Sequence, residues 1–129
     1  MMNRQRLRMN SHRKLLAWQA CRDLIQAVYR ATSTFPADER FGLTSQLRRA
    51  AVSSACNIAE GYARSGLRET AHGVSISLGS LAEVDTLFVV AEDQGYLTAA
   101  ELADLDALLQ RASQLSSGLL RQLRRRIRP

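Results

Sequence analysis

The chain has 129 residues, of which 46% are hydrophobic and only 7 are glycine and 2 proline. This composition excludes a disordered polymer, and the length allows one domain with one ordinary hydrophobic core. Aromatic residues make up only 5% of the chain, which is low for a β-sandwich and typical of a helical bundle built on leucine and alanine.

The net charge of +6 belongs to the two ends of the chain. Residues 1–14 contain five basic residues and no acidic one, and residues 121–129 contain five more and again no acidic one. The segment between them is mildly acidic. Any polyanion that binds through charge is therefore expected to meet the ends of the chain.

The first predicted helix covers residues 14–32, because apolar residues recur at steps of three and four through Trp18, Cys21 and Val28. Pro36 disfavours helix at the residue before it and so separates this helix from the next. The second predicted helix begins at Ala37 or Phe41 and ends at Tyr62.

The third predicted helix covers residues 67–94 and ends at Gly95, a residue typical of helix C-termini. Gly73 and Gly79 weaken a helix interior, which predicts tight contact with a neighbouring helix at both positions. Thr98 and Glu101 form the pattern of a capping box, and it opens a leucine-rich fourth helix.

Short connections between four helices predict an all-α, antiparallel up-down-up-down four-helix bundle. We expect the bundle at residues 14–126, a basic and flexible tail at residues 1–13, and a short tail at residues 127–129. This topology gathers the basic residues of both tails and of the second connection at one end of the bundle. These candidate nucleic-acid-binding residues are Arg4, Arg6, Arg8, Arg13, Lys14, Arg64, Arg68, Arg121, Arg124, Arg125, Arg126 and Arg128.

A basic end with many arginines is the electrostatic pattern of a protein that binds nucleic acid. Aromatic residues are not interleaved with the arginines, so recognition of the backbone or the shape fits better than stacking on single strands. Two other interpretations stay open. The charges could serve solubility and stabilise the last helix, or they could meet an acidic protein or a membrane surface.

Polar residues form a stripe at helical spacing along the second predicted helix, and a shorter stripe lies on the third. We interpret them as a partly buried structural network in which Arg49 pairs with Glu83 or Glu60. A ligand or RNA contact of Arg48 and Arg49 is the alternative. The members of the expected network are Gln46, Arg49, Ser53, Asn57, Glu60, Ser80 and Glu83.

No pattern of catalytic or metal-binding residues stands out, so we expect neither an enzyme nor a cofactor. Neither Glu60 nor Glu83 is followed after three residues by the histidine that di-iron bundles require. Cys21 and Cys56 lie among apolar or small residues and are expected to be buried free thiols. A signal peptide and a membrane helix are not expected either, which favours the cytoplasm.

Several motifs resemble four-helix bundle proteins encoded in intervening sequences of bacterial large-subunit ribosomal RNA genes. Residues 35–53, FPADERFGLTSQLRRAAVS, and residues 57–61, NIAEG, resemble the central motif of that family. Residues 79–83, GSLAE, resemble its third-helix signature, and Trp18 and residues 95–97, GYL, match as well. The resemblance covers roughly residues 14–118 and leaves the tails out. The sequence departs from the family at residues 54–56, where an apolar residue and a proline are expected.

The resemblance implies a bundle without catalytic activity. The family is similar to the accessory variability protein of diversity-generating retroelements, a ring-shaped pentamer that binds nucleic acid and a reverse transcriptase. The resemblance therefore implies a homopentamer that binds nucleic acid, RNA more than DNA, and that acts as an accessory to a nucleic-acid enzyme. The alternative is a structural or protein-interaction module with no nucleic-acid role.

Overall fold

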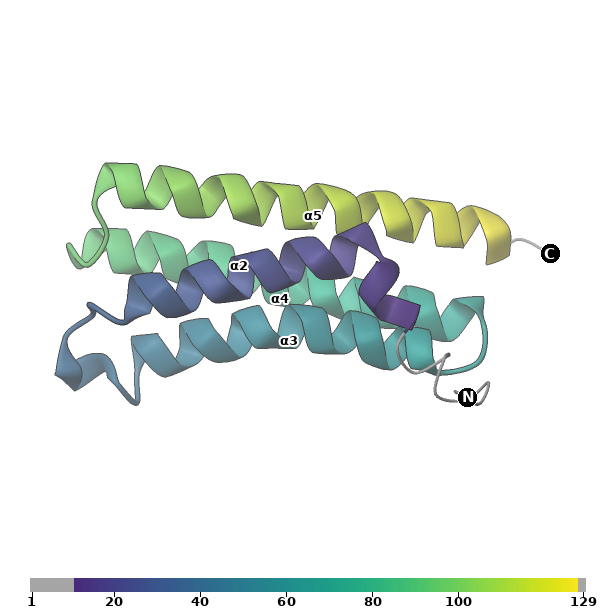
Figure 1. Ribbon diagram of the computed structural model, residues 1–129, viewed down its shortest axis with the longest axis horizontal. Coiled ribbons are helices and arrows are strands. Elements are labelled where there is room, and N and C mark those ends of the chain that lie inside the picture. Colours follow the sequence, from purple (N-terminus) through teal and green to yellow (C-terminus); the bar gives the residue numbers. More distant parts are fainter. Residues whose placement is uncertain (1–10, 128–129) are drawn as a thin grey trace.

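Four long helices make up the protein in a computed structural model that describes residues 11–127. They are α2 (Leu16–Thr32), α3 (Leu43–Ala63), α4 (Leu67–Asp93) and α5 (Ala99–Ile127). Two short 3-10 helices, η1 (Ser11–Lys14) and η2 (Ala37–Glu39), precede α2 and α3, and no strand occurs between residues 11 and 127. Figure 1 shows that successive helices run in opposite directions. The predicted all-α, up-down-up-down bundle is thus confirmed.

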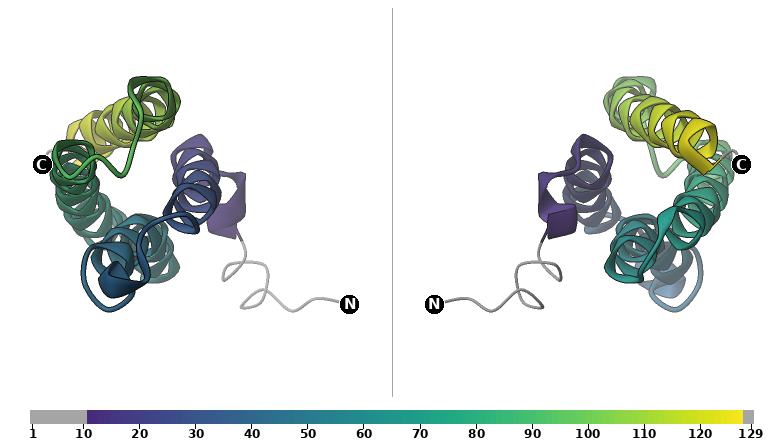
Figure 2. Two further views of the ribbon diagram at one scale, coloured as in Figure 1. Left: turned by 90° about the vertical axis from the view of Figure 1, so that its left-hand side faces the viewer. Right: turned by 90° about the vertical axis from the view of Figure 1, so that its right-hand side faces the viewer.

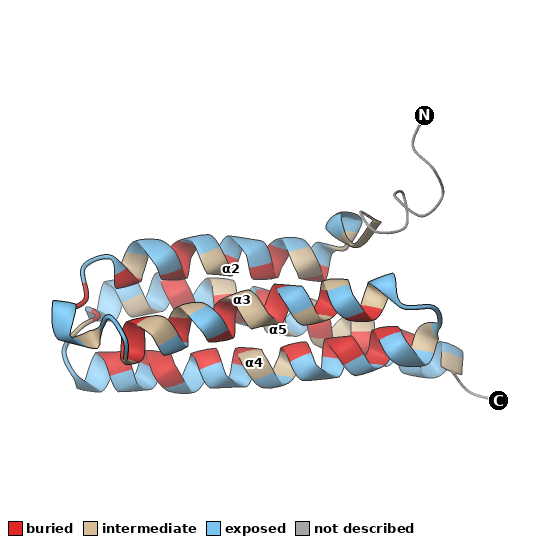
Figure 3. Ribbon diagram, turned by 90° about the horizontal axis from the view of Figure 1, so that it is seen from below, coloured by how far each residue is buried: buried red, intermediate tan, exposed pale blue. Residues whose placement is uncertain are grey.

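Seen from its ends, the bundle is a square (Figure 2). Each helix packs against two neighbours: α2 against α3 and α5, and α4 against the same two. The pairs α2–α4 and α3–α5 lie across the diagonals. Buried residues follow the inner faces of all four helices, and exposed residues follow the outer faces (Figure 3).

One level of the core is built from small polar side chains, one from each helix. Cys21, Ser54, Ser77 and Ser116 are all fully buried, among larger apolar neighbours. The Ser77 hydroxyl donates to the Ser54 carbonyl at 2.7 Å, and the Ser54 hydroxyl donates to the Ala51 carbonyl at 2.6 Å. Burial raises the pKa of the Cys21 thiol, although the three serine hydroxyls oppose this rise. Ser54 belongs to residues 54–56, where the family resemblance led us to expect an apolar residue and a proline.

Two glycines set the closest approach of α3 and α4. A Cβ added at Gly73 would lie 2.4 Å from the Asn57 carbonyl oxygen and 2.8 Å from Gly61 Cα. The tight contact predicted at Gly73 is therefore confirmed. The same prediction for Gly79 is wrong, because a Cβ at that position would meet nothing within 4 Å.

The fourth helix begins and the third ends as predicted. The Thr98 amide donates to Glu101 Oε1 at 3.0 Å, and the Glu101 amide donates to Thr98 Oγ1 at 3.1 Å, which is a complete capping box. The bond from the Thr98 amide lowers the pKa of the Glu101 carboxyl. Gly95 follows α4 with a φ of 79°, a left-handed conformation that glycine adopts without strain.

Two boundaries differ from the sequence prediction. The second long helix begins at Leu43 rather than at Ala37 or Phe41, because the chain first makes the separate turn of η2. The Glu39 carboxylate then accepts a hydrogen bond from the Leu43 amide at 3.2 Å and so supports the start of α3. Residues 11–13, which we expected in the tail, belong to η1, and η1 packs against α2 and α3.

The apolar character of α4 exceeds our expectation from the sequence. By length and composition alone, α4 has what a membrane-spanning helix needs. This test is weak for a single helix, because the core helix of a bundle passes it too. The inner face of α4 packs against α3 and α5 here, as a core helix does.

Candidate functional site

The predicted basic end is present in the described part of the chain. The start of α2, the α3–α4 connection and the end of α5 lie at the same end of the bundle (Figure 1). Their basic side chains are all exposed. We call them the basic end: Arg13, Lys14, Arg64, Arg68, Arg121, Arg124, Arg125 and Arg126. The other four candidates, Arg4, Arg6, Arg8 and Arg128, lie outside the described residues.

Few of these charges are neutralised by a carboxylate. Among residues 11–127 a single ion pair forms, between Arg64 Nη2 and Glu60 Oε1 at 3.0 Å. Both side chains are more than half exposed, so the pair contributes little to stability. The remaining cations of the basic end have no carboxylate within ion-pair distance in this part of the chain. Their positive potential therefore extends into solvent.

The opposite end of the bundle is acidic. The α2–α3 connection and the end of α4 with the α4–α5 connection lie there (Figure 1). The α2–α3 connection carries Asp38 and Glu39, and the last turn of α4 carries Glu92 and Asp93. The Tyr96 hydroxyl joins the two connections by donating to Glu39 Oε2 at 3.1 Å, and this bond raises the pKa of Tyr96. The charge separation along the sequence is thus a separation in space.

The polar network forms only in part. Ser53 Oγ and Ser80 Oγ lie 3.0 Å apart across the α3–α4 seam, and the Asn57 amide donates to the Ser53 carbonyl at 2.8 Å and to its hydroxyl at 2.9 Å. All three side chains are half-buried. This short chain of hydrogen bonds holds α3 and α4 in register.

The charged members of that network are placed differently from our prediction. Arg49, Glu83 and Gln46 are exposed, and no ion pair joins Arg49 to either carboxylate. Glu60 is exposed as well and pairs with Arg64 instead. The prediction failed because a polar stripe on an amphipathic helix usually faces water, and the long side chains of this stripe do so here.

Arg48, rather than Arg49, has the structural role. Its Nε donates to Thr32 Oγ1 at 2.8 Å and its Nη2 donates to the Tyr29 carbonyl at 3.4 Å. The guanidinium also lies 4.6 Å from the centre of the Tyr29 ring. Arg48 therefore joins α3 to the last turn of α2, and it is not available as a free ligand contact.

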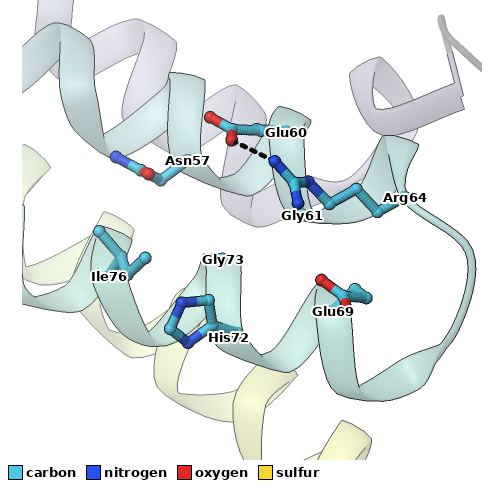
Figure 4. A pocket seen from close by; sticks show the side chains of 8 residues that line it. All are labelled: Asn57, Glu60, Gly61, Arg64, Glu69, His72, Gly73 and Ile76. Atoms are coloured by element: carbon cyan, nitrogen blue, oxygen red, sulfur yellow. Dashed lines mark hydrogen bonds and ion pairs between the residues drawn. The ribbon is translucent and has the colours of Figure 1, made fainter.

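A small hollow of about 150 Å³ lies on the outer side of the Gly61–Gly73 contact. We call it the notch. Figure 4 shows His72 on α4 between Ile76 and Glu69, across the notch from the Glu60–Arg64 pair. The notch exists because the two glycines leave its floor without side chains.

His72, which lines the notch, was not singled out from the sequence. Its signal was its position four residues after Arg68, because this spacing puts both side chains on one face of a helix. Cys56 was also misjudged, since it is exposed rather than buried. In residues 11–127 no group of three or more histidine, cysteine, aspartate or glutamate side chains could hold a metal ion.

Comparison with known proteins agrees with this architecture. No curated protein sequence matches the chain significantly. The model of a protein family described as 23S rRNA-intervening sequence protein matches residues 13–118, which include all of α2, α3 and α4 and most of α5. The match covers most of the chain and nearly the same range as the motifs in the sequence. The chain therefore belongs to the 23S rRNA-intervening sequence protein family.

Proposed function

We propose that the protein is a non-enzymatic, homo-oligomeric helical bundle that binds nucleic acid, RNA in preference to DNA, through its basic end. The observation that carries this proposal is the set of unpaired cations that three distant parts of the chain bring together. Arg68 comes from the start of α4, Arg13 and Lys14 precede α2, and the arginines of residues 121–126 come from the end of α5.

Exposed arginines without carboxylate partners are suited to phosphate oxygens, because the planar guanidinium donates two parallel hydrogen bonds. Each phosphate that is neutralised releases counterions, so binding through this end should depend steeply on salt. The family's connection with 23S rRNA sequences supports RNA over DNA.

The outer face of α4 supports self-association. Ile76, Val89 and Val90 are 42%, 50% and 39% exposed, and a Cβ at Gly79, about one turn after Ile76, would meet nothing within 4 Å. These exposed apolar side chains and the open glycine could each receive a second helix against the outer side of α4. The family resemblance favours five copies in a ring, which would bring five basic ends to one ligand and raise its affinity through avidity. We further propose that the protein acts in the cytoplasm as an accessory to a nucleic-acid enzyme.

A filter-binding salt series with a short RNA hairpin and the matching DNA hairpin tests the nucleic-acid part. Binding should be tightest at low salt, and Arg124→Glu/Arg125→Glu/Arg126→Glu should weaken it by at least about tenfold and flatten the salt dependence. Arg111→Glu is the matched control, because Arg111 is also exposed on α5 but lies outside the basic end. Absence of binding at low salt, or equal effects of both variants, would refute the proposal.

The second candidate function is a protein-interaction module without a nucleic-acid role, and the exposed apolar face of α4 is the observation that favours it. Sedimentation of the native protein tests whether this face mediates self-association or is left free for a different protein. Val89→Lys/Val90→Lys should reduce the native mass toward the 14.3 kDa of one chain. If the native protein is already a single chain, or if this variant keeps the native mass, the apolar face does not mediate self-association.

A further inference from the structure

Two neighbouring hollows lie between α4 and α5 at the basic end. Their volumes are about 440 and 350 Å³, and both are lined by Arg68 and Ile127. Arg126 lines the first hollow, and Arg124, His72 and Ser75 line the second. We call the two hollows together the α4–α5 groove. Their lining begins at the α3–α4 connection and reaches Ser75 on α4.

The walls of the α4–α5 groove are arranged for an anion. Arg68 stands on the α4 side, and Arg124 and Arg126 stand on the α5 side. None of the three has a carboxylate partner among residues 11–127, and Glu69 is the single carboxylate that lines the groove. An extended chain of phosphates could therefore meet cations on both sides, which one row of arginines on a convex helix would not provide.

His72 occupies the rim between the α4–α5 groove and the notch, because it lines both hollows. On the groove side it faces Arg68 of α4 and Arg124 of α5. On the notch side it faces Glu69 of α4 and the Glu60–Arg64 pair of α3 (Figure 4). Histidine is the side chain that ordinarily changes charge between about pH 5 and 8.

We propose that the α4–α5 groove holds a phosphodiester backbone and that protonation of His72 tightens this binding as the pH falls. This inference rests on the proposed function, because it assigns the ligand's path within the basic end and adds its regulation. A phosphodiester keeps its charge throughout this pH range, and the cations of arginine do as well. Among the residues that line the α4–α5 groove, His72 is therefore the one of the type that ordinarily changes charge in this range.

Fluorescence anisotropy with a labelled short RNA hairpin, at fixed salt and at about pH 8 and about pH 5.5, tests the proposal. We expect the native protein to bind about fivefold more tightly at the lower pH, which is the effect of one added surface cation. His72→Gln should remove this pH response. His12→Gln is the matched control and should keep it, because His12 packs against Trp18, with ring centres 5.2 Å apart, and does not line the groove.

A charge reversal tests the groove independently of pH. Arg68→Glu/Arg124→Glu should weaken binding by at least about tenfold, whereas Arg40→Glu, at the opposite end of the bundle, should leave it unchanged. Circular dichroism melting of each variant confirms that the bundle is intact.

The outcomes separate this inference from the proposed function. If the native protein binds RNA but Arg68→Glu/Arg124→Glu binds as the native protein does, the α4–α5 groove is not the site. If the native protein shows no pH response, or if His72→Gln keeps the response, His72 does not regulate the binding. Either result overturns this inference, and the proposed function survives. If the native protein binds no RNA at either pH, both fail. Binding to phosphatidylserine vesicles in place of RNA would assign the groove to a membrane surface and would overturn the proposal as well.

Discussion

Replacing Gly73 by alanine tests whether the α3–α4 contact depends on a missing side chain. The added Cβ would lie 2.4 Å from the Asn57 carbonyl oxygen and 2.8 Å from Gly61 Cα, where ordinary contacts begin at 3.4 Å. Both neighbours are backbone atoms and cannot turn away. The helices must therefore move apart by roughly half an ångström to one ångström, which forfeits about a quarter to a half of each dispersion contact along the seam.

The magnitude follows from two opposing effects. Overpacking a core costs about 1–3 kcal/mol, and a contact with backbone on the neighbouring helix belongs at the upper end of that range. Alanine recovers about 1 kcal/mol because it is a better helix former than glycine. We expect Gly73→Ala to lower the free energy of unfolding by about 2 kcal/mol, which corresponds to a fall in Tm of about 8 °C.

Urea denaturation followed by far-UV circular dichroism measures this change. Gly118→Ala is the matched control, because Gly118 lies inside α5 and a Cβ there would meet only the end of the flexible Arg121 side chain, at 3.8 Å. The control should gain up to about 1 kcal/mol. The reasoning is refuted if Gly73→Ala is as stable as the native protein or gains as much as the control.

Three further predictions concern the core, a helix end and the two thiols. Phe88→Ala should lower the free energy of unfolding in urea by about 3–5 kcal/mol, because Phe88 is 1% exposed. Phe41→Ala is the matched control and should cost about 0.5 kcal/mol or less, because Phe41 is 88% exposed; similar losses in both variants would contradict the burial pattern. Thr98→Ala should lower the Tm by an amount equivalent to about 1 kcal/mol, since it removes one half of the capping box, and an unchanged Tm would show that the cap is dispensable. A thiol reagent should label the exposed Cys56 rapidly in the native protein and Cys21 only after unfolding. Burial raises the pKa of Cys21, and the thiolate is the reactive form. Rapid labelling of both thiols would refute this assignment.

The helices and their directions could be predicted because local chemistry and global packing agree. The capping box at Thr98 and the stop at Gly95 mark the helix ends in a way that needs no tertiary information. Alternation of direction then follows from short connections. The gathering of arginines at one end is a consequence of that alternation, so it was predictable too.

The sequence could not tell which of two adjacent residues on a helix faces the neighbouring helix and which faces water. Arg48 and Arg49 are adjacent in α3 and chemically identical, yet Arg48 reaches Thr32 whereas Arg49 faces water. One step along a helix turns the side chain by about 100°, and the sequence does not say which of the two directions meets α2. Gly73 and Gly79 pose the same problem, because both weaken α4 equally in isolation and only the position of α3 distinguishes them.

The core level of Cys21, Ser54, Ser77 and Ser116 was also beyond the sequence. Serines at inward positions of a helix look like ordinary small packing residues, and a meeting of four such residues depends on the relative heights of all four helices. The α4–α5 groove depends in the same way on two segments more than fifty residues apart, as Arg68 and Arg124 show.

The short helix η1 and the last turn of α5 lie at the same end of the molecule (Figure 1). A label attached to either segment would therefore sit beside the arginines and interfere with any titration. The far end is the safer place for a label, and the turn at Gly95 is a natural position for it.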